Sequence, residues 1–208
     1  MNYYSQHGED VYIIDNFFKN KTGGTFVELG AIDGLTFSNT YTLEKYFNWS
    51  GVLIEPSIEL FDSLVSNRPK SKCYNYAIST KKGEVQFDVY DHPAMTQVSE
   101  MRSPESTDVI QKTILYPTIP ICEILHDAEI KHIDFFSIDV EGAELDVLES
   151  MDWDISVDVM LLEIKNKVSS SAEKNIKCRD FLLSKGFIHH SDTLCDEVWI
   201  DPNFEGCN

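Results

Sequence analysis

The stretch Thr25-Phe-Val-Glu-Leu-Gly-Ala-Ile-Asp-Gly34 decides the fold class. Its first half is a short apolar run holding one acid, which is typical of a buried parallel strand, and its glycines predict a tight turn where that strand ends. One helical connection later, Gly51-Val-Leu-Ile-Glu-Pro56 is a second apolar strand that ends in a carboxylate. In a parallel α/β sheet, the turn after the first strand holds a nucleotide-like ligand, and an acid after the second strand accepts hydrogen bonds from ribose hydroxyls. Together the two stretches predict an adenosine-type cofactor.

The rest of the chain alternates predicted helices with predicted strands. Apolar residues at helical spacing predict helices over residues 10–19, 39–47, 57–66, 121–130, 143–151 and 172–185. Strands are expected at 72–79 near a sheet edge, at 133–139 and 157–163, and in a terminal hairpin of 187–191 and 197–201. Residues 84–91 alternate strictly between polar and apolar side chains, which predicts a half-buried antiparallel strand. The polar segment 92–111 is predicted equally as a lid or binding segment or as a disordered surface loop. This order predicts an α/β fold with a doubly wound, mostly parallel sheet, an antiparallel strand near the C-terminus, and an inserted strand and loop around 84–121.

Length and charge limit the function classes. The 208 residues fit a single domain spanning 1–208. With 17 basic and 35 acidic side chains, the formal net charge of -18 repels phosphate backbones, which argues against nucleic acid or an anionic membrane as the main partner. The five cysteines are odd in number and form no C-x-x-C pair, so neither a disulfide framework nor a zinc site is indicated. The sequence shows no secretory signal and no membrane-spanning apolar run, so we expect a soluble, cytoplasmic protein.

Acidic residues close four of the predicted strands: Glu28, Glu55, Asp139 and Glu163. The ends of parallel strands lie along one edge of a sheet, so these acids are expected to converge where the strand order reverses. The turn from Gly30 to Gly34 lacks the G-x-G-x-x-G spacing that admits a pyrophosphate, and no P-loop motif is present, which argues against an NAD-dependent reductase. A cationic cofactor, such as a sulfonium carrying an adenosine, suits a crevice rimmed by carboxylates better.

Several motifs in a fixed order carry a family resemblance. They are Ser5-Gln-x-Gly-Glu-Asp10, Glu28-Leu-Gly-Ala-x-Asp-Gly34 with Ser38-Asn39-Thr40, Gly51-Val-Leu-Ile-Glu-Pro56, Asn75-x-Ala-Ile-Ser79 and Ser137-Ile-Asp-Val-Glu-Gly-Ala-Glu-Leu145. From Ser5 to about Glu163 the chain resembles the FkbM family of S-adenosylmethionine-dependent O-methyltransferases. The resemblance implies a class I methyltransferase fold, Rossmann-like, with a seven-stranded sheet.

The resemblance also implies roles for individual residues. For the cofactor, Gly30 with Glu28, Ala31 and Asp33 would face the methionine part. Glu55 beside Pro56 would bind the ribose, and Ala77 would lie near the adenine. Weaker candidates for binding the cofactor carboxylate or the substrate are Gln6, Ser38 and Asn39. Asp139, which also counts as a cofactor contact, would meet the acceptor hydroxyl together with Glu141 and Glu163. Glu141 is equally well explained as an acid favoured at a helix N-terminus.

Methyl transfer to a hydroxyl requires positioning, exclusion of water and removal of one proton. Asp139 is the first candidate for the base, and Glu163 or His92 could replace it, although a solvated loop imidazole is the simpler account of His92. Asp139 and Glu163 could instead hold Mg²⁺ or Mn²⁺ with waters and substrate oxygens, and metal dependence stays open.

The expected acceptor is a hydroxyl of a sugar or glycan, for example a deoxyhexose, a substrate class that the resemblance allows. Two alternatives are a methyltransferase acting on another small-molecule hydroxyl or lipid-linked acceptor, and a cofactor-binding interaction module without catalysis. Because little precedes Ser5, we also expect that the chain is one domain of a larger polypeptide with glycosyltransferase neighbours.

Overall fold

The computed structural model describes residues 1–89, 96–98, 110–164 and 172–206. None of the helices in these ranges is long and apolar enough to cross a membrane. In chain order the elements are α1 (Glu9–Ile13), the π-helical turn η1 (Ile14–Phe18), β1 (Thr25–Leu29), α2 (Tyr41–Phe47), β2 (Ser50–Ile54), α3 (Ile58–Asn67), β3 (Lys72–Tyr74), β4 (Ala77–Ile78), β5 (Gly83–Val89), β6 (Thr96–Val98), β7 (Lys112–Ile119), α4 (Ile121–Asp127), β8 (His132–Ile138), α5 (Glu144–Ser150), β9 (Ser156–Glu163), α6 (Ala172–Ser184), β10 (Ile188–Asp192) and β11 (Asp196–Ile200).

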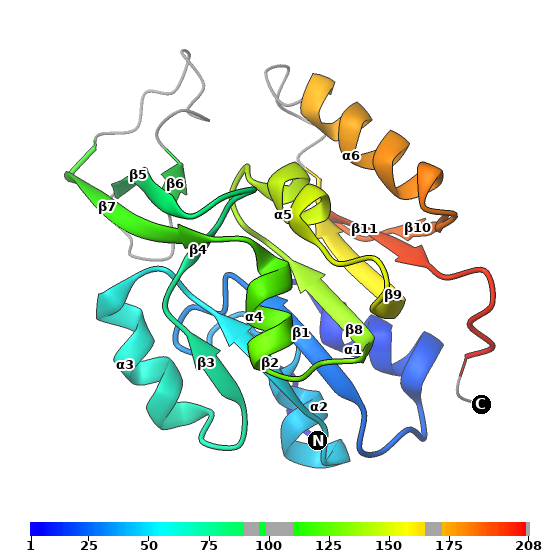
Figure 1. Ribbon diagram of the computed structural model, residues 1–208. Helices are drawn as coiled ribbons and strands as arrows, with labels where there is room; N and C mark the ends of the chain where they lie inside the picture. Colours follow the sequence, from blue (N-terminus) through cyan, green and yellow to red (C-terminus); the bar gives the residue numbers. More distant parts are fainter. Residues whose placement is uncertain (90–95, 99–109, 165–171, 207–208) are drawn as a thin grey trace.

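The main sheet has seven strands in the order β10-β11-β9-β8-β1-β2-β3 (Figure 1). Strands β3, β2, β1, β8 and β9 run parallel, and β11 is antiparallel to both β9 and β10. The strand order reverses between β1 and β8, which is the switch point where doubly wound sheets bind ligands. The predicted mostly parallel sheet and its antiparallel strand near the C-terminus are confirmed.

Helices cover both faces of this sheet and bury two apolar cores. On one face, α4, α5 and α6 contribute Ile124, Val147 and Leu182 to a cluster with strand residues such as Val27 and Met160. On the other face, η1, α2 and α3 pack Phe18, Leu43 and Leu64 against Phe26 and Phe135. The strands of the sheet centre are buried on both faces, which explains why they are nearly continuous apolar runs.

A second, four-stranded sheet has the order β4-β7-β5-β6 and lies beside the main sheet, at the upper left of Figure 1. The predicted half-buried strand at 84–91 is observed as β5, paired antiparallel with β6 and β7. Strand β7 was not predicted from the sequence; its residues alternate in burial, and it contains Pro117, a residue that is uncommon inside a sheet. Strand β6 lies inside the segment 92–111 that was predicted as loop.

The single strand predicted over 72–79 is wrong, because it is two strands in two sheets. Strand β3 pairs with β2 at the edge of the main sheet, whereas β4 pairs with β7. Between them, the Asn75 side-chain amide donates hydrogen bonds to the carbonyl oxygens of Glu55 (2.8 Å) and Pro56 (2.9 Å). These contacts hold the chain against the end of β2 while it passes from one sheet to the other.

Candidate functional site

A cavity of about 410 Å³ opens at the carboxyl ends of β1, β2 and β8. Residues that follow these strands line one side of it, and residues of β4, β5 and their connection line the other. The volume lies in the range of small-molecule sites, about 300–1,000 Å³. The second sheet therefore encloses the crevice that the switch point of the main sheet creates.

The turn after β1 is held against β2 and β8. The backbone N–H groups of Gly30 and Ala31 both donate to the carbonyl oxygen of Ile54 (3.1 Å each). Gly30 has a φ of 73°, and a Cβ at this position would lie 2.1 Å from the carbonyl oxygen of Asp139. Only glycine allows this approach, which brings the first turn against the residue that follows β8.

Glu55 is the most constrained acid of the cavity wall. It is 5% exposed, and its carboxylate accepts hydrogen bonds from the backbone N–H groups of Ile32 (2.9 Å) and Ser57 (2.8 Å). Burial raises the pKa of Glu55 to about 7, against the lowering effect of these two hydrogen bonds. Each oxygen retains a lone pair, so the carboxylate can accept two further hydrogen bonds from a ligand.

The wall next to Glu55 is apolar. Ala77 and Ile78 of β4 are buried and line the cavity together with Leu60 and Tyr76. Pro56 also lines the cavity. An apolar wall beside a carboxylate suits a ligand that has a flat apolar ring joined to a polyhydroxyl group.

Three predicted catalytic acids meet at the ends of β8 and β9. Carboxylate oxygens of Asp139, Glu141 and Glu163 lie within 4.8 Å of one another. Asp139 and Glu141 line the cavity, and Asp139 is exposed. Glu141 has a φ of 51°, a backbone conformation that is rare for a residue with a side chain and that concentrates at functional sites. The three oxygens are donors of the kind that Mg²⁺ and Mn²⁺ bind, so metal dependence stays a prediction.

Glu28 is placed differently from the other strand acids. It lies within β1, where strand alternation sets it on the face of Phe26 rather than of Val27. Its carboxylate accepts hydrogen bonds from the Ser38 hydroxyl (2.9 Å), the Thr40 hydroxyl (2.6 Å) and the Asn39 backbone N–H (2.6 Å). These three hydrogen bonds stabilise the loop that follows the glycine turn.

The buried side chain of Arg68 completes this network. Its guanidinium is fully buried and donates to the Glu44 carboxylate (2.9 Å), the Gly34 carbonyl (3.0 Å) and the Ser38 hydroxyl (3.2 Å). A Cβ at Gly34 would lie 2.6 Å from the Arg68 side chain, so the turn and the arginine fit only with glycine there. Arg68 was not singled out from the sequence, since a lone arginine directly after a helix gives no signal of burial.

Other predicted site residues lie outside the lining of the described cavity. Asp33 accepts hydrogen bonds from the backbone N–H groups of Leu35 (2.9 Å) and Thr36 (2.7 Å), which is a turn-forming arrangement. Ala31 is buried in the core, Gln6 is exposed, and Ser38 belongs to the Arg68 network. Glu163 touches the acid cluster without lining the cavity, and His92 lies outside the described residues.

Asn39 has a feature that bears on a ligand. Its side-chain amide donates to the Ser137 hydroxyl (3.0 Å), which places it between the ends of β1 and β8. Its Oδ1 atom is buried and has no hydrogen-bond partner among the residues that the structure describes. A buried oxygen without a donor is costly, so the site favours a ligand that brings one.

Sequence reasoning missed the residues that the second sheet adds to the cavity. Val85 and Phe87 of β5 line it, and so do the exposed lysines Lys81 and Lys82, of which Lys82 pairs with Glu123 (2.5 Å). The alternation of β5 signalled a half-buried strand, but nothing in the sequence indicated what its buried side covers.

Comparison with known proteins gives the following matches. A family model described as "Methyltransferase FkbM domain" matches residues 28–188. A solved structure of methyltransferase FkbM from Methylobacillus flagellatus is similar with a TM-score of 0.52 and 14% identity, over 86% of this chain and 43% of that one. A structure of Aeropyrum pernix fibrillarin with natively bound S-adenosyl-L-methionine has a TM-score of 0.51 and 13% identity, over 86% of this chain and 66% of that one. No curated protein matches the sequence. The chain thus spans less than half of the first of these structures and about two thirds of the second.

Proposed function

The chain belongs to the FkbM methyltransferase family, and we propose that it is an S-adenosylmethionine-dependent O-methyltransferase that methylates a hydroxyl of a sugar or glycan. The observation that carries this proposal is the cavity at the switch point, whose lining includes Glu55, Asp139 and the apolar surface of Ala77. Two carboxylates and an apolar wall match a cationic cofactor that ends in an adenosine.

The residues of the cavity fit this cofactor part by part. Glu55 would accept hydrogen bonds from the ribose hydroxyls, and the apolar surface at Ala77 and Ile78 would hold the adenine. Outside the lining, the buried Oδ1 of Asn39, which has no hydrogen-bond partner among the described residues, would accept a hydrogen bond from the ammonium of the methionine part. The bound S-adenosyl-L-methionine of the fibrillarin structure supports the same cofactor for this fold. When bound, the cofactor supplies an electrophilic methyl group.

Asp139 is the proposed general base. It is exposed at the cavity, next to Glu141 and Glu163, so an acceptor hydroxyl can reach its carboxylate. The Asp139 carboxylate would take the hydroxyl proton as the acceptor oxygen forms its new bond.

The acceptor is proposed to be a neutral polyhydroxyl compound. The formal net charge of -18 disfavours nucleic acid, and the exposed Lys81 in the lining would contact a polar acceptor. A role in glycan modification fits a cytoplasmic protein that works together with glycosyltransferase domains, and we propose this compartment and these partners.

Two measurements test the proposal. Isothermal titration with S-adenosylmethionine and S-adenosylhomocysteine should show binding, and absence of binding at millimolar ligand would overturn the cofactor assignment. Mass spectrometry of candidate glycans incubated with the protein and S-adenosylmethionine should show a gain of one methyl group. Binding of the cofactor without transfer to any hydroxyl compound would favour the alternative of a non-catalytic interaction module.

A further inference from the structure

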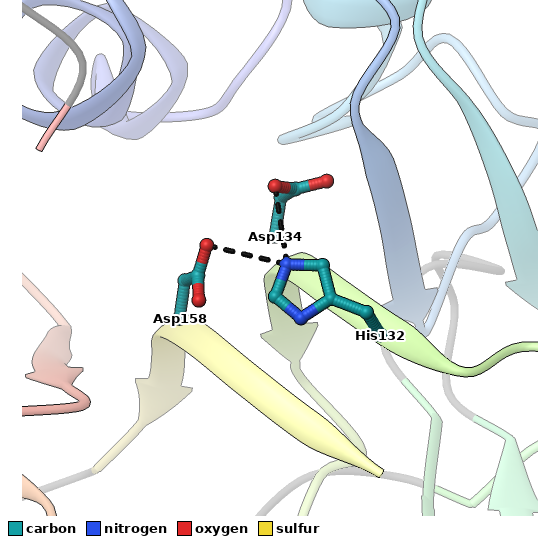
Figure 2. Close-up of side chains that lie close together, drawn as sticks. All are labelled: His132, Asp134 and Asp158. Carbon is teal, nitrogen blue, oxygen red and sulfur yellow. Dashed lines mark hydrogen bonds and ion pairs between the residues drawn. The ribbon is translucent and has the colours of Figure 1, made fainter. Parts of the chain in front are cut away.

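A second group of chemically active side chains lies at the opposite end of the same strands. His132 and Asp134 belong to β8 and Asp158 to β9. The register pairs His132 with Ser156, Ile133 with Val157 and Phe135 with Val159, which sets Asp134 and Asp158 beside each other. Figure 2 shows the three side chains directed toward one another. These residues begin the strands whose other ends reach the cavity, so the group is separate from the proposed methyl-transfer site.

The spacing of the three side chains differs from that of ordinary ion pairs in this protein. His132 Nε2 lies 3.3 Å from Asp134 Oδ1 and 3.3 Å from Asp158 Oδ2. For comparison, His126 Nε2 lies 2.7 Å from the Asp152 carboxylate and His189 Nε2 lies 2.9 Å from that of Asp192, so these hydrogen bonds are shorter than the long hydrogen bond of 3.3 Å between His132 and Asp134. Bonds of about 2.0–2.1 Å around a tetrahedral ion separate its ligand atoms by about 3.3–3.4 Å. The His132 distances match this tetrahedral spacing.

The second nitrogen of His132 is also held. Its Nδ1 lies 2.8 Å from the Ser156 hydroxyl. A metal-bound histidine is typically fixed by a hydrogen bond from its other ring nitrogen, which sets the tautomer and the direction of the lone pair. If Nδ1 donates to Ser156, the lone pair of Nε2 faces two carboxylates, and a cation between the three atoms would relieve that repulsion.

Lys21 supplies a cation to part of this group. Its ammonium contacts Asp134 Oδ1, and the backbone N–H of Thr25 donates to Asp134 Oδ2 (2.6 Å). The Lys21 side chain is 28% exposed, so it can move into solvent when another cation takes its place. Asp134 is 4% exposed and thus fixed in position.

We propose that His132, Asp134 and Asp158 form a binding site for Zn²⁺, with Nε2, Oδ1 and Oδ2 as the ligand atoms and water in the fourth position. One imidazole and two carboxylates form a mixed nitrogen and oxygen donor set that suits Zn²⁺, which binds more tightly than Mn²⁺ or Co²⁺. The ion would join β8 to β9 far from the cavity, so its role is to stabilise the fold rather than to take part in methyl transfer.

The test is a titration of the full chain, freed of metal by a chelator, with Zn²⁺ by calorimetry and with Co²⁺ by visible absorption. We expect one site whose Co²⁺ spectrum is tetrahedral. His132→Ala and Asp158→Asn should each weaken Zn²⁺ binding at least tenfold. Lys21→Gln should strengthen it, because the ammonium competes for Asp134 Oδ1. The matched control His126→Ala, which removes a histidine held at hydrogen-bond distance from the Asp152 carboxylate, should leave the affinity unchanged.

Three results would overturn the proposal. They are the absence of Zn²⁺ binding by the wild-type chain at millimolar metal, binding that survives both His132→Ala and Asp158→Asn, and binding that His126→Ala removes. In the first case the group is a polar network in which His132 bridges the two aspartates. Lys21→Gln keeps the test decisive if a ligand variant fails to fold, since a purely electrostatic network predicts no gain in metal affinity from it.

Discussion

Strands β8 and β9 carry a cluster of ionisable groups at each end, and the two clusters differ in what surrounds them. At the carboxyl end, Asp139, Glu141 and Glu163 meet at the ligand-sized cavity, which the first two of them line. At the amino end, the cluster of His132, Asp134 and Asp158 takes contacts from Lys21 and from the backbone of Thr25. The same pair of strands thus presents acids to a ligand-sized cavity at one end, whereas at the other end its acids bind neighbouring parts of the protein.

The largest expected effect separates the two ends by activity. Replacing Asp139 by asparagine removes the proposed base while keeping its shape, and general-base catalysis contributes about 10²–10⁴-fold. We therefore expect the rate of methyl transfer to fall by about that factor, measured as methylated acceptor by mass spectrometry. Calorimetry should show that S-adenosylhomocysteine still binds to the variant.

The matched control for that experiment is Asp158→Asn at the amino end of the neighbouring strand. It removes the same charge from the same pair of strands, so the methyl-transfer rate should stay within about twofold of wild type. Equal losses in the two variants would mean that the acids act through overall charge, and the assignment of Asp139 as the base would be wrong.

The second prediction concerns the layer beneath the carboxyl end. Arg68 is fully buried and holds Glu44, Gly34 and Ser38, and it also lies 3.7 Å from Glu28. Substituting Arg68→Met leaves two buried carboxylates, Glu28 and Glu44, without their cation, and breaking a buried pair costs about 3–5 kcal/mol. We expect the free energy of unfolding to fall by that amount in urea denaturation. The double variant with Glu44→Gln should recover part of the loss, and no recovery would show that the cost lies in packing alone.

The third prediction sharpens the amino end. Ser156→Ala removes the hydroxyl that fixes Nδ1 of His132, and such outer contacts are worth about 10–100-fold in metal affinity. Zn²⁺ binding measured by calorimetry should weaken within that range, while methyl transfer should not change. A change in methyl transfer with unaltered Zn²⁺ affinity would reverse the roles that we assign to the two ends.

Much of the fold follows from local sequence patterns. Strands β1, β2, β8 and β9 are buried on both faces, and such strands are continuous apolar runs in the sequence. They can therefore be predicted without knowing which distant residues they contact. Strand β7 was missed, and it contains Pro117, a residue that is uncommon inside a sheet and that here lies opposite Glu84 in the second sheet. The division of residues 72–79 into β3 and β4 depends on Asn75, whose contacts at the end of β2 join segments that are distant in the chain.

The site was predictable only where chain position fixes side-chain direction. Residues directly after a parallel strand, such as Glu55 and Asp139, lie at the ligand edge of the sheet, and both line the cavity. Glu28 fits the same sequence pattern, but it lies within β1 rather than after it. The direction of its side chain therefore depends on strand alternation and on the buried Arg68. The His132 cluster arises from the register of β8 and β9, which no spacing in the sequence reveals.

The smallest expected effect concerns Glu55, whose pKa is raised by burial from 4.5 to about 7. Only the ionised carboxylate accepts hydrogen bonds from two ribose hydroxyls with full strength. At pH 6 about nine tenths of Glu55 would be protonated and at pH 8 about one tenth, so the affinity for S-adenosylhomocysteine should rise about tenfold across this interval. Calorimetry in buffers with different ionisation enthalpies should also detect the release of a proton on binding near pH 6.

The stability of the ligand-free protein should change in the opposite direction over the same range. An acid whose pKa is higher in the folded than in the unfolded state binds extra protons when folded, so its contribution to stability is complete below about pH 4.5 and is lost as the pH rises to about 7. Asp196, whose pKa burial raises to about 6, adds a similar slope, so the comparison must be with Glu55→Gln, which keeps Asp196 and removes only the Glu55 contribution. A variant that retained the wild-type pH dependence of both affinity and stability would show that Glu55 is not the titrating group, and Asp196 would become the next group to test.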